Sequence, residues 1–137
     1  MRIANRIAEL TRVVEFVERF GAEHGVPAGI VNDLNLCLDE LLNNTITYGY
    51  GDTEPHTISV ALACDGRFVS ADIEDDARPF DPRKALAPDT RDIRTRRPGG
   101  LGLRFVNALM DEVDYVWSDG YNRVRLRKSL NPTPESL

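Results

Sequence analysis

The sequence predicts an α+β fold, a two-layer sandwich in which helices cover one face of a mostly antiparallel, mixed sheet. Three segments repeat apolar residues at three- and four-residue steps, the period of a helix that buries one face. Four shorter apolar segments pair into two hairpins, each with an Asp-Gly turn, and the two segments of the first hairpin alternate apolar and polar residues. The 137 residues suit one domain, which we place at residues 1–130, and residues 131–137 are expected to form a flexible tail.

Each predicted helix has a recognisable start or end. The first covers residues 7–20, and Gly25 punctuates the chain after it. The second covers residues 28–47 and ends at the run 48–52, Tyr-Gly-Tyr-Gly-Asp, while the third begins near Gly100. The apolar stripe of the first helix is Ile7, Leu10, Val14, Val17 and Phe20, with Ile3 as a further candidate. That of the second is Val31, Leu34, Leu38, Leu41 and Thr45, and that of the third is Leu103, Val106, Met110 and Val113.

The two hairpins flank a long irregular segment. Residues 77–98 have no clean period and contain four prolines, and loops longer than about 12–15 residues are often lids or binding segments. We therefore expect a lid between the first hairpin and the third helix. In the first hairpin, a strand with Ile58, Val60 and Leu62 is joined at Asp65-Gly66 to a strand with Val69, Ala71 and Ile73. In the second, a strand with Tyr115, Val116 and Trp117 is joined at Asp119-Gly120 to a strand with Val124 and Leu126.

The composition excludes several classes of protein. A formal net charge of −5 argues against general nucleic-acid binding. Residues 83–104 nevertheless hold seven basic and two acidic side chains, which favours a local anion such as a phosphate, with a solvated arginine-rich loop as the alternative. No apolar run is long enough to span a membrane. Cys37 and Cys64 each lie in an apolar stretch, which suits free thiols in a reducing cytoplasm.

Glu40 and Asn44 lie four residues apart in the second predicted helix, so their side chains share one face. An amide oxygen is a suitable ligand for Mg²⁺, and a carboxylate can take a proton from a hydroxyl or a water. The pair therefore suits a site where both groups act on one ligand. A solvated polar pair is the alternative.

A second candidate lies at the end of a predicted strand, where residues 72–76 hold four carboxylates. One of these aspartates, directed into a pocket beneath the sheet, would accept a hydrogen bond from an amino group such as that of adenine. A metal cluster is less well matched, because no histidine is near and the glycine of a calcium loop is missing. An acidic turn that faces water is the remaining alternative.

The third candidate is the run 96–103, Arg-Arg-Pro-Gly-Gly-Leu-Gly-Leu, which opens directly into the third helix. Glycines at a helix N-terminus let backbone N–H groups approach an anion closely, and the helix dipole favours negative charge there. The spacing is neither that of a P-loop nor that of a dinucleotide fingerprint. The run therefore indicates a phosphate site, with plain loop punctuation as the alternative.

In this order the three motifs resemble the N, G1 and G2 boxes of the Bergerat-type ATP-binding fold, which gyrase and histidine kinases share. More narrowly, the chain resembles the small bacterial anti-sigma-factor serine kinases, the RsbW-like branch, from about residue 7 to residue 128. The most specific segments are residues 38–44, 75–82, 99–103 and 109–113.

The resemblance implies that the chain binds ATP and Mg²⁺. Asn44 would hold Mg²⁺ against the ATP phosphates, and Glu40 would be the general base for a serine hydroxyl on a protein substrate. Asp75 would bind the adenine amino group. The phosphates would be lined by Gly99, Gly100, Leu101, Gly102 and Leu103.

The same resemblance bears on affinity and on partners. Ala77 stands where the family commonly has glycine, so we expect a different turn and weaker nucleotide binding. Arg12 stands where the family often has an arginine that faces a partner protein, with a solvated helix residue as the alternative. The implied partners are an anti-sigma-factor antagonist of the STAS type and a sigma factor, and homodimers are common in the family. His24 and His56 have no motif around them and are expected to be structural or surface residues.

Three functions compete on this basis. The first is an ATP-dependent serine/threonine kinase that phosphorylates the antagonist and sequesters the sigma factor, in the cytoplasm and without direct contact with nucleic acid or membrane. The second is a non-catalytic nucleotide-binding module that captures a regulator stoichiometrically. The third is an output domain with other effectors. Glu40 favours the first, because a binding module needs no base there, whereas Ala77 favours the second.

Overall fold

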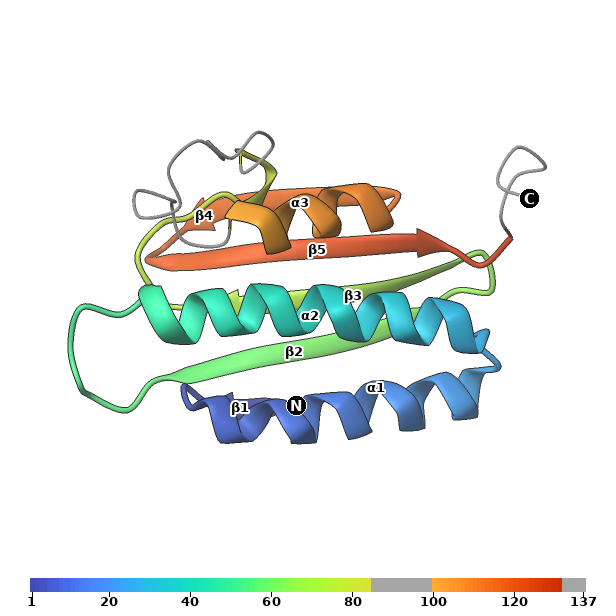
Figure 1. The fold of residues 1–137 in the computed structure, drawn as a ribbon, viewed down its shortest axis with the longest axis horizontal. Helices are drawn as coiled ribbons and strands as arrows, with labels where there is room; N and C mark the ends of the chain where they lie inside the picture. The colour runs from blue at the N-terminus through green and yellow to red at the C-terminus, as the bar shows by residue number, and fades with distance from the viewer. Residues whose placement is uncertain (85–99, 132–137) are drawn as a thin grey trace.

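The computed structural model describes residues 1–84 and 100–131, which form the predicted two-layer sandwich (Figure 1). Three helices lie side by side on one face of a five-stranded sheet, with α2 between α1 and α3. The helices are α1 (Leu10–His24), α2 (Ala28–Tyr48) and α3 (Gly100–Leu109), and the strands are β1 (Arg2–Ala4), β2 (Thr57–Cys64), β3 (Phe68–Asp75), β4 (Glu112–Ser118) and β5 (Tyr121–Ser129). No helix in the described part has the length and apolar character needed to cross a membrane.

The strand order is β1-β2-β3-β5-β4, and every described pairing is antiparallel. The sheet is therefore antiparallel in all of these pairings, in agreement with the mostly antiparallel sheet that we expected. The reason lies in the crossover: after α3 the chain enters the sheet at its far edge as β4, and the hairpin returns β5 into the gap beside β3. β5 is then antiparallel to both of its neighbours.

The N-terminal segment differs from the sequence prediction. Ile3 lies in β1 and is 2% exposed, whereas Ile7 is 51% exposed in a short 3₁₀ turn, η1 (Ile7–Glu9). The helix itself begins at Leu10, and its most buried positions are Val13, Val17 and Gly21. The sequence prediction placed the 3₁₀ turn, and Ile3 as a candidate, in the first helix because the isoleucines at positions 3 and 7 continue its helical spacing.

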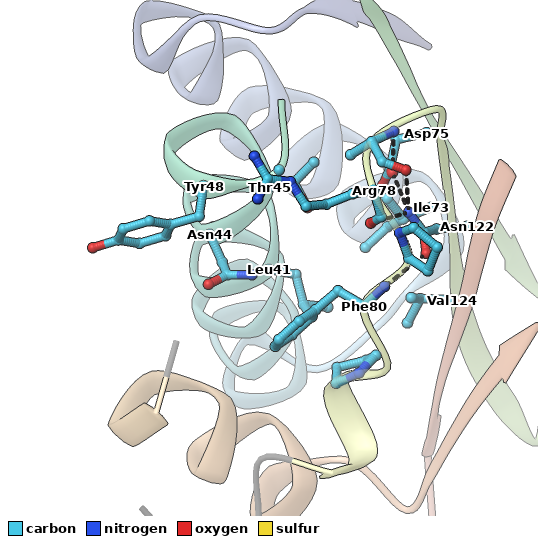
Figure 2. Close-up of a pocket in the computed structure, with 14 residues that line it drawn as sticks. Leu41, Asn44, Thr45, Tyr48, Ile73, Asp75, Arg78, Phe80, Asn122 and Val124 are labelled. Carbon is cyan, nitrogen blue, oxygen red and sulfur yellow. Dashed lines mark hydrogen bonds between the residues drawn. The ribbon is translucent and has the colours of Figure 1, made fainter. Parts of the chain in front are cut away.

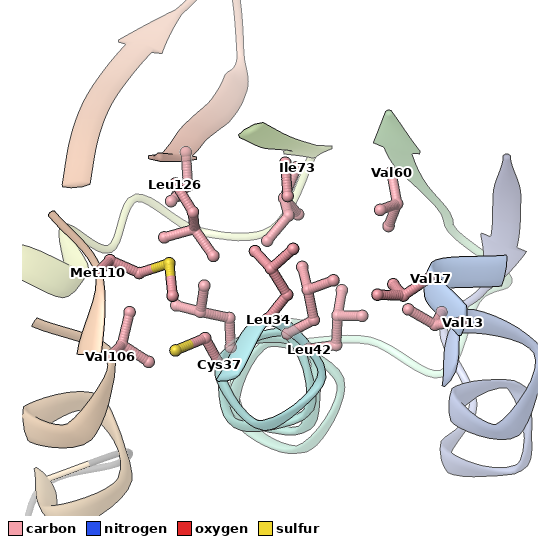
Figure 3. Packing of buried hydrophobic residues seen from close by; sticks show 14 of the residues in the cluster. Val13, Val17, Leu34, Cys37, Leu42, Val60, Ile73, Val106, Met110 and Leu126 are labelled. Carbon is pink, nitrogen blue, oxygen red and sulfur yellow. The ribbon is translucent and has the colours of Figure 1, made fainter. Parts of the chain in front are cut away.

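The central helix α2 carries most of the core contacts on the helical side. Figure 3 shows side chains of the sheet, including Val60, Ile73 and Leu126, directed at this helix. Leu34, Leu38 and Leu42 are at most 1% exposed, and Cys37 is fully buried. Both cysteines are free, and burial raises the pKa of the Cys37 thiol to about 12, so this thiol stays protonated and unreactive at neutral pH.

Both predicted hairpins are confirmed, with the strands of the first in the expected alternation. In β3 the inward positions are Val69, Ala71 and Ile73, and the same alternation places Asp75 on the core side at the end of the strand. The cross-strand partner of Asp75 is Asn122 of β5. The sheet thus ends in a pair of buried polar side chains directly above α2.

A candidate nucleotide site

A cavity of about 220 Å³ opens where β3 ends and β5 begins, above the C-terminal half of α2 (Figure 2). Most of its wall is apolar, and its polar residues include one carboxylate and two carboxamides. The lining residues are Leu41, Asn44, Thr45, Tyr48, Gly49, Ile73, Asp75, Ala77, Arg78, Pro79, Phe80, Pro82, Asn122 and Val124. An apolar slot with a few convergent polar groups is the usual form of a site for a heterocyclic ligand.

Asp75 is the acidic group of this slot and is only 4% exposed. Its Oδ1 accepts hydrogen bonds from the Ala77 N–H at 3.1 Å and from Asn122 Nδ2 at 2.9 Å. Burial raises the pKa of Asp75 above its ordinary value, and these two hydrogen bonds oppose the rise. Asp75 thus lines a pocket, as we expected of one aspartate of the acidic run, and its binding of an adenine amino group stays a prediction.

The other carboxylates of the run do not share this pocket. Asp72 and Glu74 pair with Arg125 and Arg123 across the sheet, at 2.7 and 3.1 Å. Within residues 1–84 and 100–131, no group of three or more ligating side chains could hold a metal ion. The alternation of the strand therefore separates Asp75 from its acidic neighbours, and the metal-cluster alternative gains no support from the described residues.

The turn after Asp75 packs on the end of α2. The Arg78 N–H donates to the Gly49 carbonyl oxygen at 2.9 Å, and a Cβ at position 49 would lie 2.5 Å from the Thr45 oxygen and 2.8 Å from Ala77 Cβ. Asp119 is the one non-glycine residue with positive φ in the described part, so Ala77 has an ordinary backbone conformation. The glycine that this junction requires is at position 49, and alanine at position 77 causes no backbone strain.

Glu40 and Asn44 extend the site along α2 towards α3. With Asn43, Thr47 and Tyr48 they line a neighbouring hollow of about 180 Å³, and Asn44 also lines the larger cavity. The Oδ1 atom of Asn44 is buried and has no hydrogen-bond partner among the described residues. An unpaired buried amide oxygen is costly unless a ligand completes it, so this atom fits the metal ligand that we expected at Asn44.

The first turn of α3 lies against Glu40. A Cβ added at Gly102 would overlap the Glu40 carboxylate, with Glu40 Cδ only 2.6 Å away. This contact brings the N-terminal end of α3, and with it the free backbone N–H groups of its first turn, next to the carboxylate. The first and third candidate motifs, 62 positions apart in the sequence at Glu40 and Gly102, therefore meet in space.

The remaining expected site residues have different positions. Gly100 and Leu101 begin α3, whereas the Leu103 side chain is fully buried in the core, which leaves its backbone as the part that can meet a ligand. Gly99, most of the expected lid at 77–98 and the tail at 132–137 lie outside the described residues. Arg12 is exposed on α1, pairs with Glu9 at 3.1 Å and lines neither hollow.

Asn122 is a functional candidate that none of the three sequence motifs contains. It is 4% exposed and lies on β5 beside Asp75. Its position could have been noticed, because Asn122 precedes Val124 and Leu126 at two-residue steps and so stands on the core face of its strand. A buried polar side chain in that register needs partners.

An α+β sandwich with an acidic, apolar slot beside a glycine-rich helix N-terminus is the architecture of a nucleotide-binding ATPase domain. The chain matches the histidine kinase-like ATPase domain over residues 3–128 and belongs to that family. The RsbW-like resemblance is also confirmed by a relative, the serine/threonine-protein kinase BtrW of Bordetella bronchiseptica. It is 36% identical over 104 residues, which cover 75% of this chain and 72% of that protein.

Solved structures share the fold. The histidine kinase domain of the blue-light activated histidine kinase EL346 from Erythrobacter litoralis matches with a TM-score of 0.57 and 18% identity, over 90% of this chain and 60% of that chain. The RsbU and RsbW domains of Rv1364c from Mycobacterium tuberculosis match with a TM-score of 0.58 and 19% identity, over 93% of this chain and 32% of that chain. The chain thus spans less than two thirds of either solved chain.

The contact between Gly102 and Glu40 leads to a prediction for Gly102→Ala. The added Cβ is expected to displace the Glu40 carboxylate, a flexible group, while alanine favours the helix by about 1 kcal/mol over glycine. We therefore expect an unchanged or higher melting temperature. In a kinase that uses Glu40 as its general base, the same change should lower phosphoryl transfer about tenfold, because a shift of about 1 Å in a reacting group can cost that much or more. Thermal unfolding and a labelled-phosphate assay measure the two effects, and a wild-type transfer rate would contradict the argument.

The His56 side chain contacts both the segment after α2 and the turn that contains Asp76. Its Nε2 lies 2.8 Å from Asp52 Oδ1, its Nδ1 lies 3.1 Å from Asp76 Oδ2, and its ring stacks on Tyr50 with centroids 4.2 Å apart. Hydrogen bonds to the two carboxylates raise the pKa of His56 above its ordinary value. Its protonated form, with both ring nitrogens as donors, therefore suits this structure.

A pH-dependent stability follows from the raised pKa of His56. The stabilisation is fully present below the pKa of the unfolded chain and is lost as the pH rises through the higher pKa of the folded chain. The melting temperature of wild type is expected to exceed that of His56→Gln most at pH 6 and least at pH 8.5. His24→Gln is the matched control, because His24 is exposed and its Nδ1 contacts the Phe20 carbonyl oxygen. A difference that is constant with pH would refute the prediction.

Proposed function

We propose that the protein is an ATP-dependent serine/threonine kinase that phosphorylates an anti-sigma-factor antagonist and also sequesters a sigma factor. One observation carries the proposal. The Glu40 carboxylate lies against the first turn of α3, and one helical turn further along α2 the residue with the unpaired amide oxygen, Asn44, lines both the hollow beside Glu40 and the apolar slot with the buried aspartate. The kinase name of the relative from Bordetella bronchiseptica supports the same reaction class.

In this proposal the chain's groups bind ATP at three points. Asp75 accepts a hydrogen bond from the adenine amino group, and the apolar walls of the slot cover the ring. The backbone N–H groups of residues 99–103 bind the phosphates at the positive end of the helix dipole. The free Oδ1 of Asn44 would hold Mg²⁺, which when bound would neutralise charge on the phosphates.

The chemical step needs one proton acceptor. The serine oxygen of the substrate protein forms a bond to the γ-phosphorus, and the bond from that phosphorus to the bridging oxygen breaks, so ADP leaves with that oxygen. The hydroxyl proton moves to the Glu40 carboxylate. The chain otherwise contributes position and charge stabilisation, which carry most of the catalysis in phosphoryl transfer.

The partners follow from the family resemblance and are part of the proposal. The substrate would be a STAS-type antagonist and the captured protein a sigma factor, with Arg12 exposed on α1 as a candidate contact to a partner. A homodimer in the cytoplasm is the form that we propose for the working kinase.

The test is a transfer assay with γ-labelled ATP, Mg²⁺ and a STAS-domain antagonist from the same genome. The proposal requires label on a serine of the antagonist and none on an antagonist whose serine is replaced by alanine. Asn44→Ala should abolish transfer and weaken Mg²⁺-dependent ATP binding; normal Mg²⁺-dependent binding by this variant would contradict metal binding by Asn44. ATP binding without transfer to any antagonist would leave the non-catalytic binding module.

A further inference from the structure

The carboxamide of Asn122 makes five hydrogen bonds at the edge of the nucleotide slot. Its Nδ2 donates to Asp75 Oδ1 at 2.9 Å and to the carbonyl oxygens of Ala77 and Arg78, each at 3.1 Å. Its Oδ1 accepts from the Phe80 N–H at 3.2 Å and from the Tyr115 hydroxyl at 2.6 Å. One side chain of β5 therefore joins the aspartate to the whole turn that follows it and to the edge strand β4.

These contacts fix which way the amide faces. Nδ2 has two hydrogens for three acceptors, so one hydrogen is shared, while Oδ1 uses both of its lone pairs. The opposite orientation would place the amide oxygen against two carbonyl oxygens and a carboxylate, which is unfavourable in a site that is 4% exposed. The Tyr115 hydroxyl adds the shortest of the five bonds and so holds the oxygen in place.

The two carboxylate oxygens of Asp75 have different hydrogen-bonding environments in this network. Oδ1 is occupied by Asn122 and by the Ala77 N–H, whereas Oδ2 has no hydrogen bond to any described residue. Because a carboxylate has a fixed planar shape, holding Oδ1 sets the direction of Oδ2. The oxygen that remains available to a ligand in the slot is thus the one that Asn122 does not contact.

We propose that Asn122 is a positioning residue for nucleotide recognition, which aims Oδ2 of Asp75 at the amino group of the bound base and is itself oriented by Tyr115. This inference rests on the proposed nucleotide site. It also accounts for the turn at Ala77, which Asn122 holds through the carbonyl oxygens of Ala77 and Arg78 without the need for a glycine there.

A second consequence concerns protonation. Burial raises the pKa of Asp75, the carboxylates of Asp76 and Glu74 add to the rise, and the hydrogen bond from Asn122 is the largest opposing influence, ahead of that from the Ala77 N–H. The phenols of Tyr50 and Tyr115 are the other titratable groups near this carboxylate. Only the ionised carboxylate is a pure acceptor for the amino group, so ATP affinity should rise with pH through the pKa of Asp75. Removal of Asn122 raises this pKa further and moves the affinity profile to higher pH, whereas loss of a merely structural contact would lower affinity equally at every pH.

The experiment compares wild type, Asn122→Ala and the control Asn35→Ala by titration calorimetry. Asn35 is another asparagine with a shielded side-chain oxygen, but it lies on the side of α2 that faces α1, away from the slot. The probes are ATP and purine riboside triphosphate, which lacks the 6-amino group, each measured from pH 4.5 to 8. We expect Asn122→Ala to reduce the preference for ATP over the analogue about tenfold and to shift the ATP profile to higher pH, because a hydrogen bond to a charged group is worth about that much. Asn35→Ala should keep both properties.

The outcomes separate the inference from the proposed function. Equal losses of both nucleotides with an unshifted profile would make Asn122 a structural residue alone, while ATP binding by wild type would still uphold the site. No binding of either nucleotide to wild type would overturn both. If Asn122→Ala fails to fold, Tyr115→Phe tests the same chain of contacts, with an expected two- to threefold loss of preference. An unchanged preference in that variant would then refute the inference.

Discussion

An Asp75→Asn variant is expected to fold as the wild type does and to bind ATP about a hundredfold more weakly, since the change removes a charge-assisted hydrogen bond and leaves two donors opposed. The amide oxygen of the new residue would be retained by Asn122 and the Ala77 N–H, the partners that hold Oδ1 in the wild type. Its NH₂ group would then occupy the place of Oδ2. A ligand amino group would meet a donor where it needs an acceptor.

Stability should change little in this variant. The wild-type carboxylate is 4% exposed and carries the cost of burial, as its raised pKa indicates, and a neutral amide avoids that cost. We expect a melting temperature within a few degrees of wild type, which corresponds to about 1 kcal/mol. Calorimetric titration with ATP and thermal unfolding measure the two quantities independently.

The control for Asp75 is its neighbour Glu74, which lies on the opposite face of β3 and pairs with Arg123 at 3.1 Å. Glu74→Gln should leave ATP affinity within about twofold of wild type, because exposed ion pairs contribute little. If the two variants lost affinity equally, a general change in the charge of this strand would explain the result, and the specific role of Asp75 would be rejected.

Local patterns predicted the parts of this molecule that depend on neighbours in sequence. The alternation of Val69, Ala71 and Ile73 fixes which face of β3 is buried, and Asp75 continues that register, so its direction follows from the strand period alone. The same holds for α2, whose stripe of Leu34, Leu38 and Leu41 is buried as expected. In these two elements the regular period was sufficient to predict the buried face.

The features that the sequence did not reveal depend on long-range packing. β1 has three residues, too few for a period to show, and it is a strand because it pairs with β2, as in Arg2 opposite Ser59. The contact between Glu40 and Gly102 follows from the packing of α2 against α3, which neither helix encodes alone. Asn122 becomes a functional candidate through its hydrogen bond to Asp75, which lies 47 residues earlier in the sequence. Long-range contacts of this kind can be identified only once the fold is known.

The second large effect is expected for Glu40→Gln, which should lower phosphoryl transfer to the antagonist by a factor of about 10² to 10⁴. Glutamine has the shape of glutamate, so it can keep the contact with Gly102, but it cannot accept the serine proton. ATP affinity should stay within about threefold of wild type, because Glu40 lines the hollow beside the slot and not the slot itself.

The split between transfer and binding is what distinguishes a general base from a binding group. Single-turnover transfer with γ-labelled ATP measures the first, and calorimetric titration with ATP measures the second. Asp39→Asn, an exposed neighbour that lines neither hollow, should transfer at the wild-type rate. Loss of ATP affinity in Glu40→Gln would assign the carboxylate to nucleotide binding. Transfer at an undiminished rate would instead mean that the serine proton leaves by another route, since a carboxamide at position 40 has no capacity to take it.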